Sequence, residues 1–326
     1  MSLKRLAVVL GATRGQGNSV INALLKTGQY SIRGVTRDAS TDEAQRLRER
    51  GVEVVSADLD DTSALDHAFS SAQVIFAVTT MYNGEMDREV MQGKNVANSA
   101  SAVKTLEHFI WSTLPSASTR SGGRIPVPHM DGKAQVDEYI FNSLPALARK
   151  TTFYWGGLYA ENVHYDPFRP NFLDTAKKYA WIQPVAAHTV VPMVGDHTIN
   201  TGLFVKSILQ KPEKSLPGKY VLGVADWMVH VDMLQQWADI LGEKMGERFD
   251  PIYVRSDLNT VGQLWPGIGR ELGQILRLSE QLGRQAWGKD GITPLTADDL
   301  DLRTGTSDGD LVSTRDAIKQ LGRNIR

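Results

Sequence analysis

Hydrophobic positions in the first third of the chain fall into short apolar runs separated by amphipathic stretches. The predicted strands are 6–10, 31–36, 52–57, 74–78 and 108–111, of which 6–10 is a continuous apolar run, and the stretches between them are 18–27, 41–50, 62–71 and 85–103. Continuous apolar runs are typical of strands buried on both faces, and apolar residues every three or four positions are typical of helices. The alternation predicts a parallel sheet with right-handed helical crossovers.

The rest of the chain has a different character. Tyr, Trp, His and Pro become dense between residues 153 and 194. We expect one more strand at 219–224, helices at 231–246 and 264–282, and only weak turn signals in the polar segment 298–326. The sequence therefore predicts an α/β protein. We expect residues 1–155 to form a doubly wound parallel sheet and residues 156–326 to form a smaller, aromatic-rich α/β lobe, some segments of which return to the sheet.

Composition narrows the chemistry. The chain has no cysteine, which excludes disulfides, thiolate metal sites and thiol catalysis. Its formal net charge of -1 argues against a nucleic-acid-binding surface. No stretch approaches the roughly 20 apolar residues of a membrane span, and the N-terminal apolar run is too short for a signal peptide. We expect a cytoplasmic protein. His188, Asp196 and His197 lack the spacing of a metal site, so no metal is expected.

A glycine-rich stretch, GATRGQG, follows the first apolar run and precedes a predicted helix. Glycine lets the backbone turn tightly and approach a ligand, and a helix N-terminus presents free N–H groups to a phosphate. The spacing G-x-x-x-G-x-G differs from the dinucleotide fingerprint G-x-G-x-x-G. Its place after the first strand of a repeated strand–helix pattern favours dinucleotide binding over a turn without a ligand.

Two arginines indicate which dinucleotide binds. Arg14 lies inside the glycine loop, where its planar, permanently charged side chain can reach a phosphate. Arg37 follows the second predicted strand, where NAD-binding domains carry an acidic residue that holds the ribose hydroxyls. A carboxylate there would repel a 2′-phosphate, whereas an arginine would pair with it. Both residues favour NADP over NAD; the alternative for Arg37 is a solvated surface cation.

The loop GATRGQGNSV resembles the GATGxQGxSV loop of the NmrA-like family. This family is an atypical branch of the short-chain dehydrogenases/reductases in the NAD(P)-binding Rossmann superfamily. Arg14 replaces the family's middle glycine. The resemblance covers nearly the whole chain, most specifically residues 6–165, and implies a Rossmann domain that binds NADP. The loop residues implied to contact the cofactor are Gly11, Thr13, Arg14, Gly15, Gln16 and Gly17.

Further cofactor contacts are implied after the third and fourth strands. The segment ADLDD resembles the pair that borders the adenine, so Asp58 would accept from the adenine amino group and Leu59 would pack on its face. We interpret Asp60 and Asp61 as caps of the following helix. Thr79 and Thr80 follow the fourth strand at the carboxyl end of the sheet, where ligands of doubly wound folds bind, and we expect them along the cofactor.

The catalytic pattern of the resemblance is incomplete. Short-chain reductases use a serine, and a tyrosine four residues before a lysine, but none of the nine tyrosines has that spacing. In HMDGKAQVDEY, Lys133 matches the family's lysine, and His129 stands at the tyrosine position. Ser112 follows the fifth strand, as the family's serine does. We expect Lys133 to hold the nicotinamide ribose and His129 to be either structural or a proton donor.

The segment GGLYAENV resembles the family's Y-x-E-N segment, which lines the nicotinamide end. Tyr159 offers a second proton donor unless it is only a half-buried aromatic between the lobes, and Asn162 offers a polar contact. Two functions remain open. The missing tyrosine favours an NADP(H)-binding redox-responsive regulator or sensor with a protein partner, which would also enter the nucleus. Lys133 and the aromatic lobe favour an NADPH-dependent reductase of a small apolar or aromatic carbonyl or unsaturated substrate.

Overall fold

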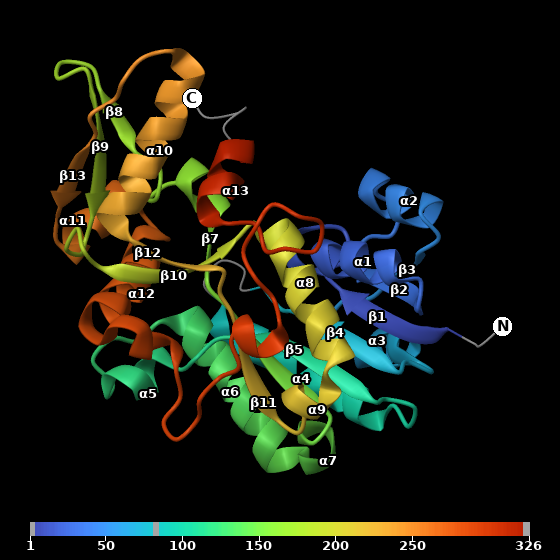
Figure 1. The fold of residues 1–326 in the computed structure, drawn as a ribbon. Helices are drawn as coiled ribbons and strands as arrows, with labels where there is room; N and C mark the ends of the chain where they lie inside the picture. Colours follow the sequence, from blue (N-terminus) through green and yellow to red (C-terminus); the bar gives the residue numbers. More distant parts are fainter. Residues whose placement is uncertain (1–3, 81–84, 322–326) are drawn as a thin grey trace.

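The computed structural model describes residues 4–80 and 85–321, and its centre is a seven-stranded sheet with the order β11-β6-β5-β4-β1-β2-β3 (Figure 1). Its strands are β1 (Arg5–Leu10), β2 (Tyr30–Thr36), β3 (Glu53–Ser56), β4 (Val74–Ala77), β5 (His108–Thr113), β6 (Thr151–Gly156) and β11 (Lys219–Gly223). All of these pairings are parallel. The strand order reverses between β1 and β4, and ligands of doubly wound folds bind at the carboxyl ends of strands at such a reversal.

Helices cover both faces of this sheet. They are α1 (Gly15–Thr27), α2 (Asp42–Glu49), α3 (Thr62–Phe69), α4 (Met86–Ala102), α6 (Pro128–Ser143) and α8 (His197–Gln210). Alternate residues of a strand point to opposite faces. Val8 and Leu10 of β1 therefore join the apolar cluster under α3, α4 and α6, while Ala7 and Val9 join the cluster under α1 and α8. The predicted α/β fold class and doubly wound sheet are confirmed.

Helix α8 packs along α1 at very short range. The N–H of Gly202 donates a 2.8 Å hydrogen bond to Ser19 Oγ, and a Cβ added at Gly202 would lie 2.2 Å from the Ser19 carbonyl oxygen. Only glycine fits at such a distance. This contact helps to bring the N-terminus of α8, with His197 and Thr198, to the glycine loop.

The second lobe contains two three-stranded sheets, ordered β12-β10-β7 and β13-β9-β8, and β11 returns from it to the large sheet. Its strands are β7 (Leu158–Tyr159), β8 (Asn171–Leu173), β9 (Lys178–Gln183), β10 (Val190–Gly195), β12 (Asp226–Val229) and β13 (Ile252–Arg255). Its longer helices are α10 (His230–Met245), α11 (Leu258–Leu264), α12 (Gly269–Leu282) and α13 (Thr314–Leu321). Figure 1 shows α10 with β8, β9 and β13 at the upper left, away from α2.

The remaining elements are short. They are the α-helices α5 (Ala117–Ser121), α7 (Pro145–Ala148) and α9 (Pro212–Ser215), and the 3₁₀ helices η1 (Ala160–His164), η2 (Gly283–Trp287) and η3 (Asp298–Leu300). Among the helices of the described ranges, none is both long and apolar enough to cross a membrane.

Two expectations for the second lobe are wrong. The helix expected over 264–282 begins later, at Gly269 of α12, because the chain leaves helical geometry around Pro266 and Gly267, where Gly267 has φ 87; the separate helix α11, which ends at Leu264, was not expected. The segment expected to show only turn signals carries α13, which buries Ala317 and Ile318 against the second lobe. Its single apolar face is short and surrounded by charged residues, which hid it in the sequence.

Candidate functional site

The glycine loop brings the start of α1 against the end of β1. Gly11 and Gly15 have φ 65 and φ 53, a region that other residues rarely adopt. A Cβ at Gly17 would lie 2.3 Å from the Leu10 carbonyl oxygen and 2.4 Å from that of Gly11. Glycine is therefore required at Gly17 by close approach. The turn therefore brings the first backbone N–H groups of α1 close to the end of β1.

The N-terminus of α1 has no capping side chain. Arg14 occupies the N-cap position in extended geometry, where its guanidinium has no acceptor to offer the free N–H groups, and the first turn contains no acidic residue. The partial positive charge of the helix end is therefore not neutralised locally. Such a helix end fits the pyrophosphate of a dinucleotide.

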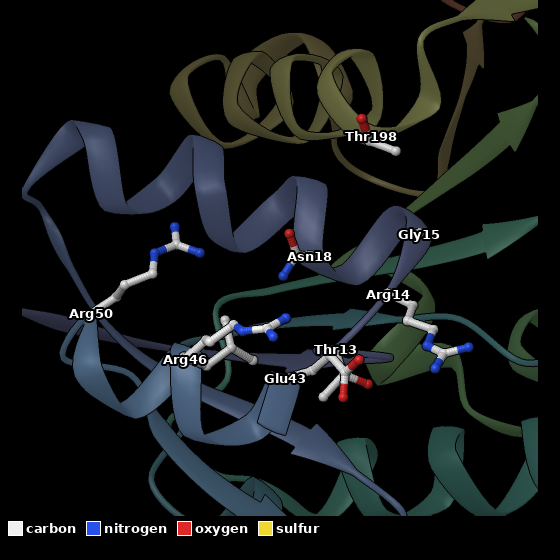
Figure 2. Close-up of a pocket in the computed structure, with 9 residues that line it drawn as sticks. Thr13, Arg14, Gly15, Asn18, Glu43, Arg46, Arg50 and Thr198 are labelled. Carbon is white, nitrogen blue, oxygen red and sulfur yellow. The ribbon is translucent and has the colours of Figure 1, made fainter. Parts of the chain in front are cut away.

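A cavity of about 290 Å³ opens beside the loop, between α1 and α2 (Figure 2). It is lined by Thr13, Arg14, Gly15, Asn18, Glu43, Arg46, Leu47, Arg50 and Thr198. Arg37 follows β2 and is exposed. Neither Arg46 of α2 nor Arg50, which caps the C-terminus of α2, was predicted from the sequence, although their four-residue spacing places them on one side of this charged helix.

The residues after β3 take different roles. Asp58 is exposed, and its Oδ1 accepts the N–H of Asp60 at 3.0 Å, while Leu59 is half-buried against the sheet's apolar cluster. Asp61 caps α3 by accepting the N–H of Ala64 at 3.0 Å, as predicted. The cap expected from Asp60 is wrong, because its carboxylate instead pairs with Arg88 at 2.7 Å.

Lys133 of α6 lies in a mostly buried polar cluster. Its Nζ is 2.9 Å from the carbonyl oxygen of Thr79, 2.9 Å from Thr79 Oγ1 and 2.9 Å from Glu89 Oε1. Thr79 Oγ1 also donates to Glu89 at 2.8 Å, and Glu89 is only 2% exposed. The ammonium therefore has three acceptors within the chain. Thr80, the next residue, is exposed.

Glu89 was missed at the level of the sequence. It lies on the same face of α4 as Gly93 and Val96, four and seven residues further on, and that face is buried. A carboxylate within an otherwise apolar helix face was the available signal, because a buried charge requires a partner.

His129 is held by the second lobe. Its Nδ1 is 2.5 Å from Glu271 Oε1, and its backbone N–H donates to the same oxygen at 3.1 Å. Burial works to raise the pKa of Glu271, but the hydrogen bonds and charge of His129 outweigh it, so that pKa lies below its ordinary value. The contact joins α6 to α12 and gives His129 a structural partner.

Tyr159 is tied to the glycine loop. Gln16 Nε2 donates a 2.8 Å hydrogen bond to Tyr159 Oη, and Gln16 Oε1 accepts from Ser112 Oγ at 2.7 Å. The Tyr159 ring stacks on His197 at 4.2 Å between centroids, and His197 Nδ1 lies 2.6 Å from Glu161 Oε2. Three elements far apart in the sequence, α1, β5 and β7, therefore meet through Gln16.

The ionisation of Tyr159 follows from this position. Burial raises the pKa of its phenol; the hydrogen bond from Gln16 opposes the shift, and the Glu161 carboxylate reinforces it. Tyr159 therefore keeps its proton at neutral pH. Asn162 follows in η1, half-buried, and its backbone oxygen accepts the N–H of Tyr165 at 2.9 Å.

The model of the NmrA-like family matches residues 3–285. The chain belongs to the NmrA-like family. An NmrA-like family domain-containing oxidoreductase of Aspergillus japonicus is 33% identical over 135 residues, which cover 40% of this chain and 41% of that relative. The chain therefore spans about two fifths of the length of such a curated relative. A Dictyostelium discoideum member is 23% identical over 257 residues, 77% of this chain and 82% of its own length.

Solved structures share the fold of this NmrA-like chain. NmrA, a negative transcriptional regulator in complex with NADP, has a TM-score of 0.68 and 19% identity, covering 99% of this chain and 92% of its own. The NADPH-dependent quinone oxidoreductase of Escherichia coli, complexed with NADPH, has a TM-score of 0.68 and 19% identity, covering 97% and 99%. One neighbour is therefore a regulator and the other an enzyme.

The expected site residues of this NmrA-like chain fall into separate groups. Lys133 and Thr79 share one polar cluster, whereas Gln16 and Tyr159 share another. Within the described ranges, no group of three or more His, Asp or Glu side chains is arranged to hold a metal ion. The assignment of all these residues to a cofactor stays a prediction.

Proposed function

We propose that this NmrA-like chain binds NADP(H) and uses it to reduce a small apolar or aromatic carbonyl or unsaturated compound. The tight turn at Gly11 and Gly15 and the uncapped start of α1 fit a dinucleotide pyrophosphate. The complexes of NmrA with NADP and with NAD, and of the quinone oxidoreductase with NADPH, support a nicotinamide dinucleotide. Curated relatives named as oxidoreductases support the reaction class.

The hydrogen bond from Gln16 to Tyr159 carries this proposal. When bound, the reduced nicotinamide supplies a hydride, and a carbonyl that receives it at carbon also needs a proton at oxygen. Because Tyr159 Oη accepts from Gln16 Nε2, its own proton is not engaged by that amide and can pass to the substrate oxygen. The raised pKa of Tyr159 keeps that proton in place until it is needed.

Lys133 would act as a fixed cation near the nicotinamide ribose. Glu89 and Thr79 hold its ammonium in one position, so it contributes charge and orientation. A ribose hydroxyl of the cofactor would then contact both Lys133 and Thr79. Thr79 follows β4 at the carboxyl end of the sheet.

The second candidate is a redox-responsive regulator that binds NADP(H) and a protein partner without turnover, in the cytoplasm or nucleus. It is favoured by the pairing of His129 with Glu271, which engages the residue at the family's tyrosine position. The likeness in fold to NmrA also agrees with it. Neither candidate requires direct contact with nucleic acid.

Turnover separates the two candidates. NADPH oxidation is followed with a panel of quinones and aromatic aldehydes, for the unmodified protein, Tyr159→Phe and Tyr165→Phe. Tyr165→Phe is the control, because Tyr165 lies in the same lobe, is 65% exposed, and loses the same phenol hydroxyl. We expect the rate to fall about a hundredfold in Tyr159→Phe alone, with NADPH binding retained. Binding without turnover in any protein, together with NADP-dependent co-purification of a transcription factor, would favour the regulator.

A further inference from the structure

The cleft between α1 and α2 carries more positive charge than its own residues neutralise. Arg46 extends from α2 across the cleft toward Thr13 and Asn18 (Figure 2). In the described part of the chain, the guanidinium groups of Arg14 and Arg46 form no hydrogen bond and no ion pair. Arg50, by contrast, donates to Asn22 Oδ1 at 2.6 Å. Two guanidinium groups therefore face one cavity without a fixed counter-charge.

The position of the cleft decides which anion fits. Thr13, Arg14 and Gly15 form one end of its wall and also belong to the glycine loop. An anionic group bound in the cleft is therefore part of the same ligand that binds the glycine loop. The pyrophosphate of a dinucleotide belongs at the start of α1, so the remaining phosphate that can enter the cleft is the 2′-phosphate of the adenosine ribose.

We propose that Arg46 is a specificity-determining residue that binds the 2′-phosphate of NADP together with Arg14, an inference that rests on the proposed binding of NADP(H). A guanidinium presents several N–H donors in one plane and matches phosphate oxygens, which a point charge does not. Glu43 stands in the same cleft, and its carboxylate opposes the bound phosphate. The negative charge of Glu43 therefore limits how much more tightly NADP binds than NAD.

The test compares Arg46→Ala with Arg48→Ala. Arg48 lies on α2 and is exposed, but does not line the cleft, so its removal changes the net charge equally. Calorimetry measures the affinities of NADP, NAD and adenosine 2′-monophosphate for both variants and the unmodified protein. Arg46→Ala should weaken NADP and adenosine 2′-monophosphate about tenfold or more, and should leave NAD unchanged. Arg48→Ala should leave all three unchanged, and Glu43→Gln should tighten NADP only.

The outcomes separate this inference from the function on which it rests. If the unmodified protein prefers NADP and Arg46→Ala keeps that preference, the role of Arg46 is overturned while NADP(H) binding stands. If Arg46→Ala weakens NADP and NAD equally, Arg46 does not read the 2′-phosphate. If the unmodified protein binds neither dinucleotide, the proposed function fails, and this inference fails with it.

Discussion

The carboxylate of Glu89 is 2% exposed and lies 2.9 Å from the ammonium of Lys133. Removing one partner of a buried ion pair leaves the other charge buried without a partner, which costs about 3–5 kcal/mol of stability. Glu89→Ala should therefore lower the free energy of unfolding by about 3 kcal/mol, measured by urea denaturation. Asp87→Ala is the control, because Asp87 is exposed on the same helix.

A double variant sharpens the test of this pair. The double variant Lys133→Met with Glu89→Leu removes both charges and fills similar volumes. It should therefore be more stable than Lys133→Met alone or Glu89→Leu alone, each of which leaves one charge without its partner. If Glu89→Ala were as stable as Asp87→Ala, the ion pair would contribute nothing to folding.

A second buried carboxylate should make stability depend on pH. Burial raises the pKa of Asp137 to about 7, even though the charge of Lys289 and hydrogen bonds from Trp111 and Tyr220 pull it down. The folded state therefore holds a proton that the unfolded chain releases near its ordinary pKa of 3.8. Stability from this group is present at low pH and is lost as pH rises toward about 7.

The side chain introduced in the variant Asp137→Asn cannot titrate, so the variant does not lose this stability as pH rises. The free energy of unfolding of Asp137→Asn, relative to that of the unmodified protein, should therefore increase from about pH 4 to about pH 7. Urea denaturation across this range measures the difference. Glu138→Gln is the control, because Glu138 is exposed on the same helix. If the difference in free energy of unfolding from the unmodified protein did not change with pH for either variant, Asp137 would not hold its proton in the folded protein.

At the scale of elements, the contact between α1 and α8 depends on a missing side chain. Replacing an interior helical glycine by alanine usually stabilises a helix by about 0.5–1 kcal/mol. At Gly202 the new Cβ would lie 2.2 Å from the Ser19 carbonyl oxygen, so Gly202→Ala should instead destabilise by about 2 kcal/mol. Thermal and urea unfolding measure both effects.

Gly262→Ala in α11 is the matched control, because its nearest neighbour would be Arg270 Cβ at 3.5 Å, an ordinary contact. It should stabilise the protein. Gly202→Ala should also weaken NADP binding, since α8 carries His197 and Thr198 to the glycine loop. Stabilisation by both substitutions would mean that α1 and α8 can separate without cost.

The sequence predicts elements best where the apolar pattern is local. The strands of the first 113 residues were found as short apolar segments, and the helices between them from apolar residues at every third or fourth position. Helix α8 was missed because it is buried on most sides and includes buried polar residues such as Asn200 and Thr201, so no amphipathic pattern remained. Elements made by long-range packing leave no local pattern.

At the scale of the whole molecule, the site joins segments that the sequence separates. The glycine loop was evident because a local backbone requirement fixes its residues. Gln16 contacts Ser112, 96 positions away, and Tyr159, 143 positions away, and the pairing of His129 with Glu271 spans 142 positions. Residue type and spacing suggested most of these side chains, but only the fold shows which of them touch.

The net charge of -1 also bears on cofactor choice. A nearly neutral molecule has no general attraction for anions, so a preference for NADP must come from local cations such as Arg14 and Arg37. Both side chains are exposed, so salt should screen them. The ratio of NADP to NAD affinity should therefore exceed about tenfold at low salt and shrink as ionic strength rises, while NAD affinity changes little.

Arg37→Glu should reverse the preference, because a carboxylate repels the 2′-phosphate and accepts the free ribose hydroxyls of NAD. Arg48→Glu makes the same change of net charge on α2, away from the cleft, and should keep the preference for NADP. Calorimetric titration of both cofactors at two salt concentrations measures each effect. A preference for NADP that survives high salt and Arg37→Glu would mean that shape, and not the charge at the end of β2, selects the cofactor.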